Sequence, residues 1–231
     1  YHPNSSLVSS VTFKNGPNTV LTTAKSYDNL TRLTNITNMP ASDTPRSFTY
    51  IYNNANQRTR ITLADGSYWI YEYDNLGQVT SGKKYFSDNA PVLGQQFDYA
   101  FDGIGNRTST TTNGRNANYS ANNLNQYLQR DVPGAFDVFG TAKADATVTV
   151  NNQSTTRHEE YFYKELTLNN TSSPVFEEIT VVGVKNNAGL SNEDAVTEKM
   201  GSVYLPKTPE PFTYDDDGNL LSDGRWNYTW D

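Results

Sequence analysis

Few side chains in this sequence could carry out covalent chemistry. It holds two histidines, His2 and His158, and no cysteine, so a Ser-His-Asp arrangement would need one of those two residues. His158 precedes Glu159 and Glu160, which an acid–base or metal site could use, but a solvated strand end is the favoured interpretation. No spacing of Asp and Glu singles out a pair suited to glycoside hydrolysis. We therefore predict no catalytic residue, no cofactor and no enzymatic activity.

One acidic segment resembles a calcium loop, with Asp215, Asp217 and Asn219 as the candidate ligands. It lacks the EF-hand spacing and the distal bidentate Glu that such a loop uses. The same segment falls at the turn of a sequence repeat, which accounts for its Asp and Gly without a metal. We predict no metal site and keep calcium as the less favoured alternative.

The composition predicts an all-β protein with many turns. The chain of 231 residues carries 18 Lys and Arg against 25 Asp and Glu, a net charge of −7. A nucleic-acid partner needs a clustered basic face, which is missing. The 27 Asn favour turns, and the 16 Tyr, 10 Phe and 3 Trp favour strands. No apolar run approaches the ~18 residues of a membrane span.

A short phrase recurs five times: an aromatic residue, Asp or Asn, two variable residues, a turn residue and a polar residue, followed by a strand. The Asp or Asn can close an Asx-turn, and the fifth position holds residues that tolerate a positive φ. Thr31 is the exception at that position, and we expect its turn to be of another type. The predicted repeat turns contain Tyr27, Asp28, Tyr52, Asn56, Tyr73, Asp74, Gly77, Phe101, Asp102, Gly105, Tyr214, Asp215 and Gly218.

Further turns lie between the copies. Asp65-Gly66 and Asp223-Gly224 are sequences typical of two-residue hairpin loops. The segment 67–73 alternates as a strand does, so each repeat amounts to about one β-hairpin. Adjacent hairpins are expected to pair into a continuous sheet.

Two aromatic rows stand out in the repeats. Trp69, Tyr71 and Tyr73 alternate along one predicted strand. Trp226, Tyr228 and Trp230 form a second row of the same kind. The favoured interpretation is a pair of cross-strand ladders that stiffen the sheet. The alternative is that Trp69, Tyr71, Trp226 and Trp230 contact a glycan or a partner.

The repeats resemble the RHS/YD-repeat family, which includes bacterial Rhs proteins, the B–C components of insecticidal Tc toxins and animal teneurins. The phrases at 73–80, 119–127 and 214–220 carry the resemblance, which covers about 1–131 and 210–231. It implies a strip of antiparallel hairpins that spirals into a hollow shell, and in toxin members the shell encloses a C-terminal toxic domain. The family's autoproteolytic motif has no counterpart in this sequence, so no protease residue is carried over.

Between 132 and 209 the phrase disappears and another β pattern takes its place. Strands are predicted at 147–150, 161–168, 175–184 and 202–205, separated by Asn-rich turns. We predict a small antiparallel β-sandwich inserted into the repeats. The expected organisation is therefore repeats over 1–131, the inserted sandwich over 132–209, and resumed repeats over 210–231.

These observations predict a structural repeat segment of a large secreted or cell-surface protein, which forms part of a β shell or scaffold. The alternative is an adhesion module that binds carbohydrate or a partner through the sandwich or the aromatic rows. The expected partners are flanking repeats or further copies of the chain, and also an enclosed toxin domain or a surface glycan. We interpret the chain as an internal piece of a longer protein. Its expected contact points are the edges near Thr12-Phe13 and Tyr228–Trp230.

Overall fold

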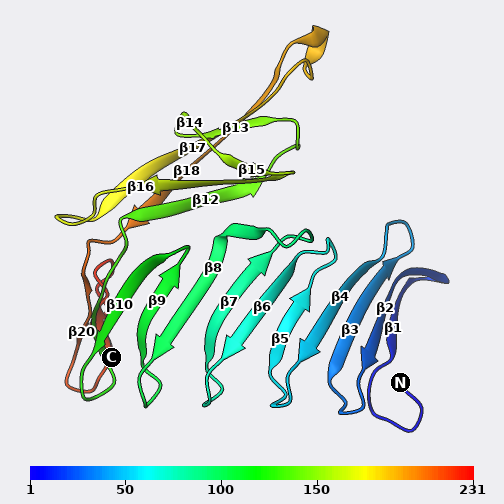
Figure 1. The fold of residues 1–231 in the computed structure, drawn as a ribbon, viewed down its shortest axis with the longest axis horizontal. Helices are drawn as coiled ribbons and strands as arrows, with labels where there is room; N and C mark the ends of the chain where they lie inside the picture. Colours follow the sequence, from blue (N-terminus) through cyan, green and yellow to red (C-terminus); the bar gives the residue numbers. More distant parts are fainter. The chain divides into compact units, whose positions relative to one another are not determined.

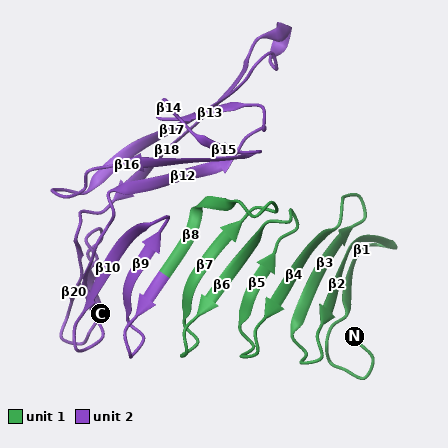
Figure 2. Ribbon diagram, viewed as in Figure 1, with its two compact units in different colours: residues 1–98 green, residues 99–231 purple.

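In the computed structural model, which describes residues 1–231, the chain divides into two compact units, Tyr1–Asp98 and Tyr99–Asp231 (Figure 2). Strands make up nearly all of the regular structure, and the single helical element is the 3-10 turn η1 (Leu190–Asn192). The all-β prediction is therefore confirmed. No helix has the length and apolar character that a membrane span requires.

Unit 1 is an antiparallel sheet in which each strand pairs with the next one along the chain (Figure 1). This is the hairpin strip that the repeat predicts. Its strands are β1 (Ser10–Asn15), β2 (Asn18–Tyr27), β3 (Leu33–Pro40), β4 (Arg46–Tyr52), β5 (Arg58–Thr62), β6 (Tyr68–Tyr73), β7 (Val79–Tyr85) and β8 (Pro91–Phe101), the last of which continues into unit 2.

The aromatic residue of each repeat in unit 1 lies at a break in the strand register. The register shifts at Ser26/Tyr27, Ile51/Tyr52 and Glu72/Tyr73. Such a bulge adds one residue to a strand and increases its local twist. The repeat therefore encodes both a turn and a bend at the same end of every hairpin.

Very little of unit 1 is buried. Tyr68 and Val92 are its only buried hydrophobic residues, and every residue of β1 is exposed, including Phe13 at 49%. A sheet with so few buried side chains has no hydrophobic core of its own to hold it. Cross-strand and turn contacts must therefore hold unit 1 together.

Unit 2 contains a second run of paired strands from the repeats. They are β9 (Arg107–Thr112), β10 (Arg115–Ala121), β11 (Tyr127–Arg130) and β19 (Glu210–Pro211), each antiparallel to its neighbour. The short strands β20 (Thr213–Tyr214) and β21 (Leu220–Ser222) form a separate pair.

The remaining strands of unit 2 form two sheets around one hydrophobic core. One sheet has the order β12-β16-β15 and the other the order β14-β13-β17-β18. The strands are β12 (Ala135–Thr141), β13 (Thr147–Val150), β14 (Gln153–Ser154), β15 (Thr156–His158), β16 (Tyr161–Thr167), β17 (Val175–Lys185) and β18 (Ala195–Leu205). Val148, Val150, Phe162, Leu166 and Ile179 form the buried core between them.

This pair of sheets is the small β-sandwich that the sequence predicts. β13, β16 and β17 match the predicted runs, and β18 begins seven residues earlier than expected. β17 and β18 extend as one long hairpin whose tip holds η1 (Figure 1). The division at 131/132 and 209/210 stays a prediction. The two compact units divide between Asp98 and Tyr99.

One buried asparagine joins the start and the end of the sandwich segment. The side-chain nitrogen of Asn170, a residue only 1% exposed, donates to the carbonyl oxygens of Val132 (3.0 Å) and Pro206 (2.7 Å). The backbone carbonyl of Asn170 accepts from the backbone N–H of Thr208 at 3.0 Å. Buried amide groups of this kind need all their partners, so Asn170 holds the two crossing segments in one arrangement.

An arginine on β10 connects the repeat strands of unit 2 with the sandwich. The guanidinium of Arg115 donates to Asp137 on β12 at 2.5 Å and also to Glu165 on β16. The hydroxyl of Tyr163 donates to the same Asp137 at 2.7 Å. Burial is the larger cause and this hydrogen bond the second, and together they raise the pKa of Tyr163 to about 12.

Candidate interaction surface

The turn after each repeated aromatic residue has one hydrogen-bonding pattern. In the first copy the N–H of Asp28 donates to the carbonyl of Arg32, and the N–H of Thr31 donates to the carbonyl of Asp28, both at 3.0 Å. The Asp28 carboxylate accepts from the N–H groups of Leu30 (2.9 Å) and Arg32 (3.0 Å). The two backbone hydrogen bonds recur in the turns that begin at Asn53, Asp74, Asp102, Asn122 and Asp215.

The fifth position takes a positive φ in all five copies of the phrase and in the similar turn that begins at Asn122. The angles are 63° at Thr31, 63° at Asn56, 84° at Gly77, 95° at Gly105, 62° at Asn125 and 87° at Gly218. The expectation that Thr31 belongs to another type of turn is therefore wrong. A left-handed threonine is strained, and here the contacts of Asp28 with Leu30 and Arg32 hold the turn in spite of that strain.

One further turn differs from expectation. Asp65-Gly66 belongs to a longer turn, in which the N–H of Leu63 donates to the carbonyl of Ser67 at 2.7 Å. Asp65 supports this turn from its third position, where its carboxylate accepts from Ser67. The turn at Asn122 follows the repeat pattern although Ala121 stands where the phrase has an aromatic residue.

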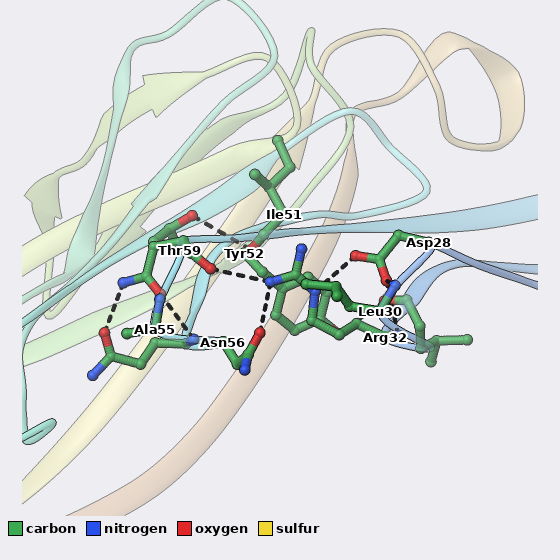
Figure 3. A network of polar contacts seen from close by, with 11 residues as sticks. Asp28, Leu30, Arg32, Ile51, Tyr52, Ala55, Asn56 and Thr59 are labelled. Carbon is green, nitrogen blue, oxygen red and sulfur yellow. Dashed lines mark hydrogen bonds and ion pairs between the residues drawn. The ribbon is translucent and has the colours of Figure 1, made fainter.

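The sixth residue of one turn contacts the fifth residue of the next turn. In unit 1 the guanidinium of Arg32 donates to the carbonyl oxygen of Asn53 at 3.1 Å. It also donates to the side-chain oxygen of Asn56 at 2.9 Å (Figure 3). The side-chain nitrogen of Gln57 lies next to Gly77, and a Cβ atom on Gly77 would be 3.3 Å from it. Successive hairpins of unit 1 are thus tied together at their turns.

The same arrangement recurs within unit 2. The side-chain nitrogen of Asn106 donates to the side-chain oxygen of Asn125 at 3.1 Å. The side-chain nitrogen of Gln126 lies next to Gly218, and a Cβ atom on Gly218 would be 3.2 Å from it. The connected turns in each unit are called the turn edge below. The polar residue at the sixth position was the sequence signal for these contacts, since it recurs in every copy as Arg, Gln or Asn.

Tyrosine hydroxyls add a second set of links between hairpins. The hydroxyl of Tyr52 donates to the carbonyl of Leu33 at 2.8 Å, and that of Tyr73 donates to the carbonyl of Arg58 at 2.6 Å. Both acceptors are the seventh residue of the preceding copy. In unit 2 the hydroxyl of Tyr127 accepts from the N–H of Arg107 at 2.9 Å. Sequence reasoning assigned Tyr127 no such role.

The turn edge exposes aliphatic side chains at the fourth position of the phrase. In unit 1 Leu30 is 64% exposed and Leu76 is 72% exposed. In unit 2 the corresponding residues are Ile104 at 74% and Leu124 at 75%. Single exposed aliphatic residues are ordinary on a protein surface, but here one position of the repeat supplies all four.

Hydrogen bonds stabilise the charged form of the turn carboxylates. The hydrogen bond from the side chain of Asn106 lowers the pKa of Asp102 below its ordinary value. The N–H groups of Asn106 and Ile104 act in the same direction, and burial opposes them. The side chain and the N–H of Asn219 lower the pKa of Asp215 in the same way. These carboxylates are ionised at neutral pH and are used within their own turns.

The candidate calcium ligands lie at this kind of turn. Both carboxylate oxygens of Asp215 accept from Asn219, at 2.7 Å from the backbone N–H and 2.9 Å from the side chain. The structure holds no group of three or more His, Cys, Asp or Glu side chains that could bind a metal ion.

The two histidines lie in different parts of the chain. His2 packs its ring edge-on against Tyr27, with ring centroids 5.6 Å apart, and His158 lies on β15.

The two predicted aromatic rows differ in structure. Trp69 and Tyr71 lie on β6 with nearly parallel rings, 8° apart and 6.2 Å between centroids. The second row does not lie on a strand, because only an isolated bridge between Ser222 and Asn227 forms there. Trp226 and Trp230 are 57% and 58% exposed. The expectation of a second strand face is therefore wrong.

Comparison with known proteins identifies part of the repeat region. Residues 46–86, which include the copies at Tyr52 and Tyr73, match the family model of the RHS Repeat. No curated protein matches the chain. Among solved structures, the chain is similar to a crystal structure of TcdB2-TccC3-Cdc42, at 12% sequence identity and a TM-score of 0.45. The match covers 87% of this chain and 11% of that one, so this chain spans only a small part of that protein's length.

Proposed function

We propose that this chain, whose residues 46–86 match the family model of the RHS Repeat, is a structural segment of a larger β shell or scaffold. The observation that carries the proposal is the series of contacts along the turn edge. Arg32 donates a hydrogen bond to Asn56, and the side chain of Gln57 lies next to Gly77. Contacts that recur once per hairpin can continue for as many repeats as the protein contains. This arrangement supports a role in building a wall of repeated hairpins.

The wall needs further strands to be stable. β1 pairs with β2 on one side only, and its exposed residues include Val11 at 40% and Phe13 at 49%. An exposed, apolar edge strand is a template for pairing with another chain or repeat. We propose that flanking repeats of the same polypeptide, or another copy of the chain, cover this edge. A secreted or cell-surface location and an enclosed C-terminal domain are parts of the same proposal.

Sedimentation of the full chain at micromolar concentration tests the scaffold role. We expect the wild-type chain to self-associate, and we expect Val11→Lys with Phe13→Lys to reduce that association, because charges protect a free edge. Val20→Lys is the matched control, since Val20 is 46% exposed but lies on β2, which is paired on both sides. A cooperatively folded monomer at all concentrations would contradict the proposal.

A second candidate function is contact with a glycan or a partner through the exposed tryptophans. Trp226 and Trp230 are more than half exposed. The guanidinium of Arg225 lies 5.0 Å from the centroid of the Tyr204 ring and 5.1 Å from the centroid of the Trp226 ring. Exposed aromatic faces with a neighbouring cation suit sugar rings and partner surfaces. A glycan array with the wild type and with Trp226→Ala and Trp230→Ala tests this candidate. Equal signals from all three proteins would reject it.

A further inference from the structure

The sandwich of unit 2 contains an open cleft between its two sheets. The cleft has a volume of about 500 Å³, within the range of small-molecule sites. Val148 and Phe162, which are 3% and 6% exposed, line it together with Val181. The part of the cleft nearest the core is therefore apolar.

Small residues keep the cleft open. Gly140 and Ala142 line it from the side of β12, and Ala146 and Gly183 line it from the side of the other sheet. At Gly140 a Cβ would come within 2.9 Å of the Phe162 ring, so that glycine is needed for packing. Gly183 is different. A Cβ at that position would meet nothing closer than the carbonyl oxygen of Thr197 at 4.0 Å, and its φ is not positive.

Gly183 therefore leaves empty a space that an ordinary side chain would fill. Protein interiors are close-packed, and both a cavity and a glycine in the middle of a strand reduce stability. A β-branched residue would pack better in a strand at this point. The open space is thus a feature that stability alone does not explain.

The cleft also has an unbalanced charge. Three lysines, Lys143, Lys185 and Lys199, line it, and no acidic residue does. Lys185 is paired with Asp145 at 2.9 Å, whereas the exposed Lys199 on β18 makes no ion pair. A lysine that points inward from an edge strand can serve to prevent edge pairing. That role would account for Lys199 but not for Gly183.

We propose that this cleft binds an amphipathic anion, a molecule with an apolar body and one terminal carboxylate or sulfonate. The apolar body lies against Val148, Phe162 and Val181, and the anionic group is placed at the ammonium of Lys199, with Lys143 beside the same opening. This pairing of an apolar floor with a cationic rim is complementary to such a ligand on a chain whose net charge is −7. The site is independent of the scaffold role.

Isothermal titration calorimetry of the full chain with decanoate tests the proposal. We expect saturable binding that weakens with added salt, because an exposed ammonium is screened. Decanol has the same alkyl chain without the charge and should bind more weakly.

Gly183→Val should weaken decanoate binding by about tenfold or more, because the new side chain occupies the apolar part of the cleft. Gly201→Val is the matched control on the neighbouring strand β18, where a Cβ would meet nothing within 4 Å. It should leave binding unchanged.

A second variant keeps the test decisive if Gly183→Val does not fold. Lys199→Gln combined with Lys143→Gln should lower decanoate affinity about threefold or more and remove its salt dependence, while decanol binding stays the same. The proposal is overturned if wild-type protein does not bind decanoate, if decanol binds as tightly as decanoate, or if the folded Gly183→Val protein binds like the wild type. Equal effects of Gly183→Val and Gly201→Val would overturn it as well.

Discussion

The guanidinium of Arg32 donates to the side-chain oxygen of Asn56 at 2.9 Å and thereby joins the turns of two successive hairpins. Arg32 also pairs with Asp28 of its own turn at 2.7 Å and lies over the Tyr52 ring, 5.0 Å from its centroid. One side chain thus holds its own turn and the next one. In a sheet with so little buried surface, such contacts take the place of a core.

Removing this side chain should destabilise unit 1. We expect Arg32→Met to lower the free energy of unfolding by about 1–2 kcal/mol, since hydrogen bonds to a charged, partly exposed group are lost. Arg46→Met is the control, because the Arg46 side chain is 65% exposed and its ion pair with Asp43 is long at 3.6 Å. Urea denaturation measures both variants. Equal losses would show that the contacts of Arg32 contribute nothing specific.

The left-handed threonine should be improved by a residue that tolerates its backbone. We expect Thr31→Asn to raise the free energy of unfolding by about 0.5–1 kcal/mol, because asparagine adopts a positive φ at lower cost. Thr108→Asn on β9 makes the same change in an extended segment and should bring no gain. Thermal denaturation compares the two, and a destabilised Thr31→Asn protein would contradict the account of strain at Thr31.

Acid should weaken the turns through their carboxylates. The folded pKa of Asp102 lies below its ordinary value of 3.8, so its contribution to stability is present above that pH and is lost as the pH falls toward the folded pKa. Asp102→Asn should therefore lose less stability than the wild type on acidification below pH 3.8. Asparagine fits this position, as Asn53 and Asn122 show.

Urea midpoints measured across this pH range check the prediction. Asp216→Asn is the control, because Asp216 is exposed and the carboxylate that accepts the hydrogen bonds of this turn is that of Asp215. It should show the same acid dependence as the wild type. If Asp102→Asn also matches the wild type, the turn carboxylate does not contribute to the pH dependence of stability.

The buried asparagine of unit 2 should be essential for the sandwich. Asn170→Leu keeps the approximate size but leaves the carbonyl oxygens of Val132 and Pro206 without their donor. We expect a loss of about 2–4 kcal/mol, as for other buried groups left unpaired. Asn169→Leu changes the exposed neighbour and should cost much less. Thermal denaturation and limited proteolysis near residues 132 and 206 measure the difference; equal protease sensitivity of both variants would refute it.

The local features of the repeat could be predicted from sequence because each is decided within a few residues. An Asp or Asn before a left-handed residue closes its turn regardless of what lies further along the chain, as at Asp74 and Gly77. Alternation predicted β6, β13 and β16 for the same reason. The all-β class and the hairpin strip followed from these local signals.

Features that depend on residues far apart in sequence were decided only by the tertiary structure. Arg32 meets Asn56 across 24 positions, and Arg115 meets Glu165 across 50, distances at which no local pattern predicts a contact. Thr31 adopts a positive φ because its turn is held by contacts that outweigh its own preference. Likewise, the free space at Gly183 depends on how closely two sheets approach each other, which is a property of their packing and not of either strand alone.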